Sequence, residues 1–316
     1  MKFHSFAPRY LLIAVIFLFY ISLPSCQAKF LNQIKTTDLT PKFNKLKSNK
    51  FIYFKNLKYT LSNNDTLVDI AVKFKIGFFH LTLANPKIDP WVPPPNKTII
   101  IPKEVLIPKE FIKDNTIIIN LPEMRLYYFK NKKFFIAPIG IGVKNSLIKI
   151  DTYTIVRKKK KPYWYPPPSI RKEDPTLPKI VPPGPDNPMG EYALYLDKGL
   201  YAIHGTNKVY SIGRRCTHGC IRLYPEDIKF LFYNVPLKTK VIVYYEPYKL
   251  AIQNKKIYIQ AYPDMENYIK SPVFYIIKKL DKLINSKKTK YTIDLLKLEK
   301  IIEKPNGLIY EIGKVY

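Results

Sequence analysis

Cysteine, histidine and acidic side chains are all scarce in this sequence. Its 316 residues include 3 Cys, 4 His and 24 Asp plus Glu, against 53 Lys plus Arg. Without the N-terminal segment that holds Cys26, only Cys216 and Cys220 remain, which excludes the disulfide framework that stabilises many small secreted domains. The two remaining thiols are therefore not part of a set of structural disulfide bonds, and a chemical role has to be considered for them.

The shortage of acidic residues leaves a net charge of +29. Such a charge on its own suggests an anionic partner. However, no nucleic-acid-binding motif accompanies it, and the abundance of Lys, Asn, Ile, Tyr and Phe is also what an A+T-rich genome gives on translation. We favour this compositional explanation over a nucleic-acid surface, and we expect the basic run Arg157–Lys161 to be a solvated loop or strand end.

The first residues have the pattern of an export signal. Two basic residues precede an apolar run over residues 10–23, which is shorter than the roughly 20 residues of a membrane span. Small residues up to Ala28 then offer a cleavage site, so we predict a signal peptide over residues 1–28. An uncleaved anchor and lipidation at Cys26 are the alternatives. All three place the body of the protein outside the cytoplasm.

The remaining cysteines lie in one stretch, residues 203–227, which also holds two of the four histidines. His204 precedes Cys220, and such residues can act as base and nucleophile because the thiolate is the reactive form of Cys. Nearby glycines allow tight turns that bring backbone N–H groups close to a bound carbonyl, at positions 205, 213 and 219. Arg215 or Arg222 could bind a substrate carboxylate.

A zinc site is the alternative use of the same side chains. Four N/S ligands are available, from His204, Cys216, His218 and Cys220. Three of them fall within five residues, whereas structural zinc sites use pairs that lie farther apart. We therefore favour a cysteine nucleophile.

The stretch resembles the signature of the L,D-transpeptidase (YkuD-type) catalytic domain. The matching segments are His204-Gly205-Thr206, Ile212-Gly213, His218-Gly219-Cys220-Ile221-Arg222-Leu223 and Asp227. Trp164 and the segment Asn187-Pro188-Met189-Gly190 are similar to the periplasmic ErfK/YbiS subgroup. The strand that begins near Lys149 lacks the usual Thr-Pro.

The resemblance implies a role for each site residue. Cys220 would be the nucleophile, and His204 the proton donor and acceptor, with its ring oriented by the backbone carbonyl of Gly205. His218 and Gly219 would support the oxyanion. Substrate would be bound by Arg222, Thr206 and Trp164, and neither a metal nor an organic cofactor would be needed. An adjacent imidazolium is expected to lower the pKa of the thiol.

The implied reaction is acyl transfer on peptidoglycan in the periplasm. Cys220 would attack the bond between the third residue of a tetrapeptide stem and its terminal D-alanine, and the thioacyl-enzyme would pass the stem to an amine. The subgroup favours the C-terminal lysine of an outer-membrane lipoprotein as acceptor. A second stem, giving a 3→3 cross-link, is the alternative, as is a non-catalytic wall-binding protein with a degenerate domain. Peptidoglycan stems and glycan are thus the expected partners.

The sequence predicts an α+β protein that is mainly β. Short β-rich runs over residues 114–246 suit a sandwich or barrel, with a helix at Pro225–Tyr233. The proline-rich insertion Pro162–Pro188 is either a binding lid or a stiff surface excursion. Residues 29–50 are polar and lysine-rich and are predicted to be a linker.

Residues 51–105 have a β-α-α-β pattern that resembles a LysM module. We expect strands at 51–61 and 98–102, a helix capped by Asp65, a second helix over 78–84, and a packed His80. Residues 247–316 should form a small C-terminal α/β subdomain with two amphipathic segments, 273–284 and 293–302, and a strand at 308–312. Cys216 is either a small buried hydrophobe or a thiol that could form a reversible disulfide with Cys220.

Overall fold

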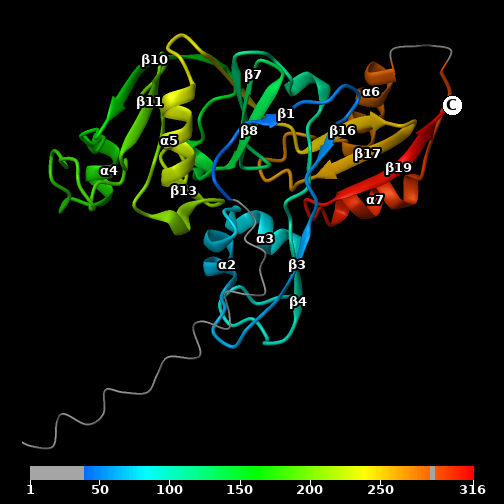
Figure 1. The fold of residues 1–316 in the computed structure, drawn as a ribbon, viewed down its shortest axis with the longest axis horizontal. Coiled ribbons are helices and arrows are strands. Elements are labelled where there is room, and N and C mark those ends of the chain that lie inside the picture. The colour runs from blue at the N-terminus through cyan, green and yellow to red at the C-terminus, as the bar shows by residue number, and fades with distance from the viewer. Residues whose placement is uncertain (1–38, 285–288) are drawn as a thin grey trace, which may run out of the picture. The chain divides into compact units, whose positions relative to one another are not determined.

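The computed structural model describes residues 39–284 and 289–316 (Figure 1). The predicted signal peptide lies outside these ranges, as do residues 29–38 of the predicted linker. Thr40–Tyr316 form one compact unit. Among the described helices, none combines the length and the apolar character needed to cross a membrane. The fold is α+β and mainly β, as predicted.

A curled nine-stranded sheet forms the centre of the molecule. Its strands are, in spatial order, β1 (Asn44–Lys45), β8 (Lys133–Pro138), β7 (Arg125–Lys130), β6 (Thr116–Asn120), β15 (Lys240–Tyr244), β10 (Thr152–Lys160), β11 (Tyr192–Leu196), β12 (Ala202–His204) and β14 (Ile221–Arg222). Gly140, just after β8, exchanges backbone hydrogen bonds of 2.9 and 3.0 Å with Arg222 of β14. The last strand of the sheet thus bonds back to the chain beyond β8, which supports the barrel-like prediction.

The sheet is buried on both faces in its central part. Strand β6 shows this directly, because Ile117 and Ile119 enter the main core while Ile118, on the opposite face, enters a second cluster. Helix α5 (Pro225–Asn234) covers the main core. Part of the predicted linker, strand β1, is an edge strand of this sheet, paired with β8.

Residues 52–106 contain the predicted β-α-α-β arrangement, which we call the N-terminal module. Strand β3 (Leu57–Thr60) pairs with β4 (Thr98–Ile101), and β2 (Ile52–Tyr53) pairs with β5 (Val105–Leu106). The single strand predicted over 51–61 is wrong, since Phe54 between β2 and β3 has φ 63° and interrupts the extended chain.

The two short helices of the module are α2 (Leu67–Lys73) and α3 (Phe78–Ala84). The predicted Asp65 cap is wrong by one residue. Thr66 caps α2 by accepting a hydrogen bond from the N–H of Asp69 at 3.0 Å, whereas Asp65 accepts from the N–H of Ser62 at 2.7 Å.

The C-terminal subdomain is a four-stranded sheet covered by two helices. Its strands are β16 (Tyr248–Gln253), β17 (Lys256–Ala261), β19 (Ile309–Val315) and β18 (Tyr291–Ile293), and its helices are α6 (Pro272–Ile284) and α7 (Leu295–Glu303). The second amphipathic segment predicted is therefore divided, because Ile293 ends β18 and Asp294 caps α7. Hairpin β16–β17 was not predicted, although Asn254 marks its turn with φ 52°.

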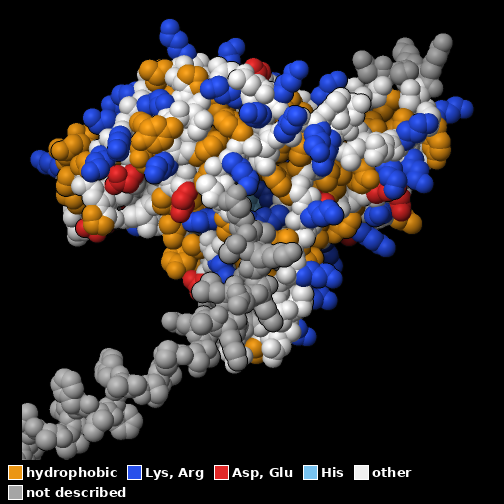
Figure 2. Space-filling model, viewed as in Figure 1, with side chains coloured by type: hydrophobic (Ala, Val, Ile, Leu, Met, Phe, Trp, Pro, Cys, Tyr) orange, Lys and Arg blue, Asp and Glu red, His pale blue; other side chains and the backbone are white. Residues whose placement is uncertain are grey.

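Lys and Arg side chains are scattered over the visible face among apolar and neutral ones (Figure 2). The basic run Arg157–Lys160 lies at the end of strand β10, with most of its side chains exposed, as expected for a solvated strand end.

The three regions meet at one buried carboxylate, Glu123, in the turn between β6 and β7. Its Oε1 atom lies 2.6 Å from Nζ of Lys249 on β16 and 3.0 Å from Arg125 on β7. Tyr127 donates to the same oxygen at 2.7 Å. His80 of α3, buried as expected, contacts the backbone carbonyl of Glu123 at 2.7 Å through Nε2. Burial raises the pKa of Glu123, but the two cations outweigh it and bring the pKa to about 2.

Replacing Glu123 by Gln should destabilise the whole fold by about 3–5 kcal/mol, because two buried cations lose their anion. Urea unfolding at pH 7 measures this. Since the folded pKa of about 2 lies below the ordinary 4.5, the stabilisation present above pH 4.5 is lost as the pH falls toward 2. The variant should therefore lose less stability than the wild type over that interval.

Glu226→Gln is the matched control. Glu226 on α5 pairs with Lys75 of the module at 3.0 Å, but the pair is largely exposed. Its loss should cost less than about 1 kcal/mol. Equal effects of the two substitutions would contradict the central place of Glu123.

Candidate active site

His204 ends strand β12 with its side chain almost fully buried. Its Nδ1 atom lies 2.6 Å from the carbonyl oxygen of Gly205. Because a carbonyl only accepts hydrogen bonds, Nδ1 carries the hydrogen and Nε2 is unprotonated. Burial and then the charge of Arg222 lower the pKa of His204 to about 4, against smaller opposing effects of two backbone carbonyls. The ring is thus neutral near pH 7 and can accept a proton.

Cys220 directly precedes strand β14, after a tight turn. Gly219 has φ 107°, and a Cβ atom there would lie 2.7 Å from the ring of Tyr201. Thr217 closes the turn, because its hydroxyl donates to the carbonyl of Cys220 at 2.7 Å and accepts from the N–H of Gly219 at 3.2 Å. The backbone around the nucleophile candidate is therefore fixed before any ligand arrives.

Parallel pairing of β12 with β14 brings His204 and Cys220 to the same edge of the sheet, with Ile203 opposite Ile221. The thiol is not bonded to the imidazole. Within the described ranges, its hydrogen-bond acceptor is the carbonyl of Leu200, at 3.7 Å.

Burial raises the pKa of Cys220, although the N–H of Ala202 and the charge of Arg222 oppose this effect. The resting pair is therefore a neutral thiol beside a neutral imidazole. The expected imidazolium that lowers the thiol pKa is not what this structure contains. The physical reason is that both groups are desolvated, and Arg222 disfavours a second positive charge on His204.

An aromatic wall borders the thiol. Trp164, Tyr195 and Cys220 all pack against a small buried cluster formed by Met189, Ala193 and Ala202. The guanidinium of Arg157 covers the ring of Tyr195 at 3.9 Å from its centroid. Trp164 therefore packs against the same cluster as Cys220, and its role in substrate binding stays a prediction.

The proline-rich insertion contributes to the same region. Trp164 is fixed to Val181 by two backbone hydrogen bonds of 2.9 Å, and the insertion contains helix α4 (Pro168–Glu173). Glu173 at the end of α4 lies 3.0 Å from Nε2 of His218. These contacts close to Cys220 favour the lid interpretation over a separate surface excursion. They also give His218 a bracing contact, while its support of the oxyanion stays a prediction.

Comparison with known proteins assigns this region. Residues 114–243 match the family model of the L,D-transpeptidase catalytic domain, YkuD. The chain is 39% identical over 199 residues to "Probable L,D-transpeptidase ErfK/SrfK" of Salmonella typhimurium, covering 61% of this chain and 63% of that protein. It is also 39% identical over 214 residues to "Probable L,D-transpeptidase YbiS" of Escherichia coli, covering 66% of each. The chain contains an L,D-transpeptidase catalytic domain of the YkuD family.

The match to these relatives spans slightly less than two thirds of their own length. Among solved structures, the L,D-transpeptidase of Enterococcus faecium (C442S mutant) is similar with 20% identity and a TM-score of 0.34, covering 44% of this chain and 53% of that one. That likeness carries no weight here, and the assignment rests on the sequence matches.

Two further residues of the transpeptidase motif, Thr206 and Asp227, are buried. The hydroxyl of Thr206 accepts from the N–H of Lys208 at 3.0 Å and so shapes a turn, and its role in substrate binding stays a prediction. Asp227 is buried in the first turn of α5, where burial raises its pKa to about 7.

Cys216 and Cys220 are both free thiols with different neighbours. Cys216 contacts the carbonyl of Ser211 at 3.6 Å and a guanidinium nitrogen of Arg222 at 3.9 Å. Cys220 lies instead beside the aromatic wall. In the described part of the chain no three His, Cys, Asp or Glu side chains gather closely enough to hold a metal ion, so the zinc alternative has no ligand set there.

Tyr195 of the transpeptidase domain was missed, although a signal was available. Along β11, Tyr192, Leu194 and Leu196 enter the main core, whereas Ala193 and Tyr195 lie on the face of the Cys220 cluster. Alternation of apolar core residues along positions 192–196 would have placed Tyr195 on the opposite face from the core.

Glu173→Gln should loosen the insertion of the transpeptidase domain, because a half-exposed pair contributes at most about 1 kcal/mol. We expect amide hydrogens of residues 162–188 to exchange up to about fivefold faster, measured by mass spectrometry at pH 6. His218→Gln should give the same change, and Lys172→Gln should give none. Unchanged exchange in both pair variants would remove the bracing role of His218.

Proposed function

We propose that the protein is a cysteine-dependent L,D-transpeptidase that acts on tetrapeptide stems of peptidoglycan in the periplasm. The observation that carries this proposal is the state of His204. Its Nδ1–H is held by the Gly205 carbonyl, so Nε2 is the free base on the strand next to Cys220. The family match and the names of the similar proteins supply the reaction class.

The first step transfers the thiol proton to Nε2 of His204 as the sulfur attacks the carbonyl carbon of the third stem residue. A C–S bond forms, and the tetrahedral intermediate collapses by breaking the C–N bond to D-alanine. His204 returns the proton to the leaving amine. His204 and Cys220 suffice without a third, carboxylate residue, because a cysteine nucleophile needs less assistance from a general base than a serine does.

In the second step an amine attacks the thioester, and its proton returns through His204 to the sulfur of Cys220. The reaction consumes no metal or organic cofactor. We favour the C-terminal lysine of an outer-membrane lipoprotein as acceptor, because of the likeness to the ErfK/YbiS proteins. The amine of another stem, giving a 3→3 cross-link, is the second candidate. The N-terminal module would bind glycan as a LysM-like domain.

A wall-binding protein with a degenerate catalytic domain is the competing function. The hydrogen-bonded arrangement of the residues around Cys220 argues against this competing function. Thr217, Gly219 and the hydrogen-bonded His204 have kept the arrangement that nucleophilic catalysis needs, whereas a binding role makes no use of it.

Cys220→Ala should abolish the acyl adduct with a disaccharide-tetrapeptide, and His204→Ala should reduce its rate of formation by about 10²–10⁴-fold, the usual contribution of a general base. Intact-protein mass spectrometry detects the adduct, whose mass is that of the ligand minus D-alanine. Cys216→Ser is the control and should retain the adduct. Full activity of either site variant would contradict the assignment.

The rate of acylation should depend on pH through His204. Since its pKa is lowered to about 4, the neutral base is present down to about pH 5, and the acid limb should lie near pH 4 and not near the ordinary 6.5. Arg222→Gln removes a cation that lowers this pKa, so its acid limb should move upward. Stopped-flow measurement of D-alanine release over pH 3.5–8 tests both. An unmoved limb in Arg222→Gln would exclude the electrostatic coupling.

A further inference from the structure

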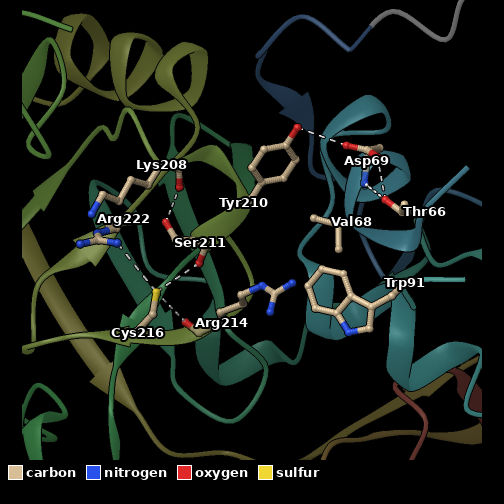
Figure 3. A pocket seen from close by; sticks show the side chains of 10 residues that line it. All are labelled: Thr66, Val68, Asp69, Trp91, Lys208, Tyr210, Ser211, Arg214, Cys216 and Arg222. Carbon is tan, nitrogen blue, oxygen red and sulfur yellow. Dashed lines mark hydrogen bonds between the residues drawn. The ribbon is translucent and has the colours of Figure 1, made fainter. Parts of the chain in front are cut away.

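A cavity of about 690 Å³ lies between the N-terminal module and the transpeptidase domain (Figure 3). The module contributes Thr66, Val68, Asp69 and Trp91, and the transpeptidase domain contributes Lys208, Tyr210, Ser211, Arg214, Cys216 and Arg222. Cys220 and Trp164 do not line it, because they pack against the Met189 cluster. The cavity is therefore distinct from the aromatic wall beside the thiol, although Arg222 is close enough to influence His204 and Cys220 electrostatically.

Three cations line this cavity, and within the described residues no carboxylate pairs with any of them. Nε of Arg214 and Nε of Arg222 are buried without a hydrogen-bond partner. Lys208 uses its backbone N–H in a turn, and its ammonium forms no ion pair with a carboxylate of residues 39–284 or 289–316. With no carboxylate paired to them, the positive charges of these side chains favour an anionic ligand in the cavity.

Asp69, the carboxylate in the cavity wall, does not pair with these cations. Asp69 accepts from the hydroxyl of Tyr210 at 3.2 Å and from the hydroxyl of Thr66 at 2.7 Å. Figure 3 shows Asp69 and Thr66 on the opposite side of the cavity from Lys208 and Arg222. The positive side of the cavity therefore remains available to an anion.

The opposite wall is aromatic. Trp91 is 59% exposed, and Arg214 extends toward it, with its guanidinium 3.7 Å from the ring centroid of Phe78 and 5.5 Å from that of Trp91. These stacking contacts hold the guanidinium plane in place before a ligand binds. A flat apolar surface next to a few fixed polar groups is the usual composition of a site for a small organic ligand.

We propose that this cavity binds a carboxylate-bearing part of a peptidoglycan strand, with the carboxylate on Arg214 and Arg222 and a sugar ring on Trp91. This rests on the proposed function for the identity of the ligand, and it deepens that function by giving the strand a second site that shares Arg222 with the catalytic stretch but is not lined by Cys220. The matching features are the bidentate fork of arginine for a carboxylate and the open face of Trp91 for a ring.

Trp91 offers a direct test. The chain has two tryptophans, so Trp164→Phe leaves Trp91 as the single reporter, and Cys220→Ala in the same full-length chain prevents turnover. Titration with a disaccharide-tetrapeptide should give a saturable change in tryptophan fluorescence. Adding Arg214→Gln should weaken binding about tenfold or more, and Arg214→Lys should recover part of the loss, because it restores charge but not the fork. Lys300→Gln, on the exposed face of α7, should have no effect.

Ligand variants decide the chemistry. The disaccharide-tetrapeptide with amidated carboxyl groups should bind at least about tenfold more weakly. Binding of a neutral chitin oligosaccharide should not depend on Arg214. Equal binding of the amidated ligand, or titrations unaffected by Arg214→Gln, would overturn the proposal. A lysine-terminated peptide that binds through Arg214 in place of the muropeptide would also overturn it. If the proposed catalysis is wrong, the enzyme with Cys220 forms no acyl adduct while this binding persists, so the two failures are distinguishable.

Discussion

The buried carboxylate of Glu123 is the contact on which the arrangement of the protein depends. It receives Lys249 from the C-terminal subdomain and Arg125 from the central sheet, while its own carbonyl receives His80 from the module. Such a cluster is tolerable only when every member is satisfied, because any unpaired charge would face a low dielectric. The three regions therefore cannot shift independently without leaving a buried charge unpaired, which also gives the C-terminal subdomain a structural purpose that its sequence did not reveal.

A second contact connects the module directly to the catalytic stretch. Helix α3 has no side-chain cap, and its first N–H groups donate instead to the carbonyls of Ile212 and Gly213, each at 3.1 Å. Gly213 has φ 76°, and a Cβ atom there would collide with the backbone of Phe78. The Ile212-Gly213 element of the motif is thus explained by docking of the module. Because that docking fixes residues 208–214, it also fixes one wall of the cavity.

Local patterns predicted what local forces decide. Strand alternation located most of the central sheet, and the motif located His204, Gly205 and Cys220. Long-range pairing could not be read in this way, since Glu123 and Lys249 are 126 residues apart and neither has a local signal. The neutral resting state of His204 and Cys220 was also inaccessible, because it depends on burial and on the proximity of Arg222. The environment of Arg214 could not be predicted either, because the aromatic rings beside its guanidinium, Phe78 and Trp91, come from the module.

Arg222 connects the cavity to the acid–base chemistry. Its charge helps to keep His204 neutral, and its side chain lines the cavity without a carboxylate partner among the described residues. A carboxylate bound there would offset part of that charge, and the pKa of His204 would rise because the imidazolium would face less repulsion. A base is most effective when its pKa lies near the working pH. Occupation of the cavity by a peptidoglycan strand would therefore make His204 a stronger base at the moment when substrate is present. The pKa of the Cys220 thiol would rise as well, because the charge of Arg222 lowers it too, so the cavity would tune both partners of the proton transfer.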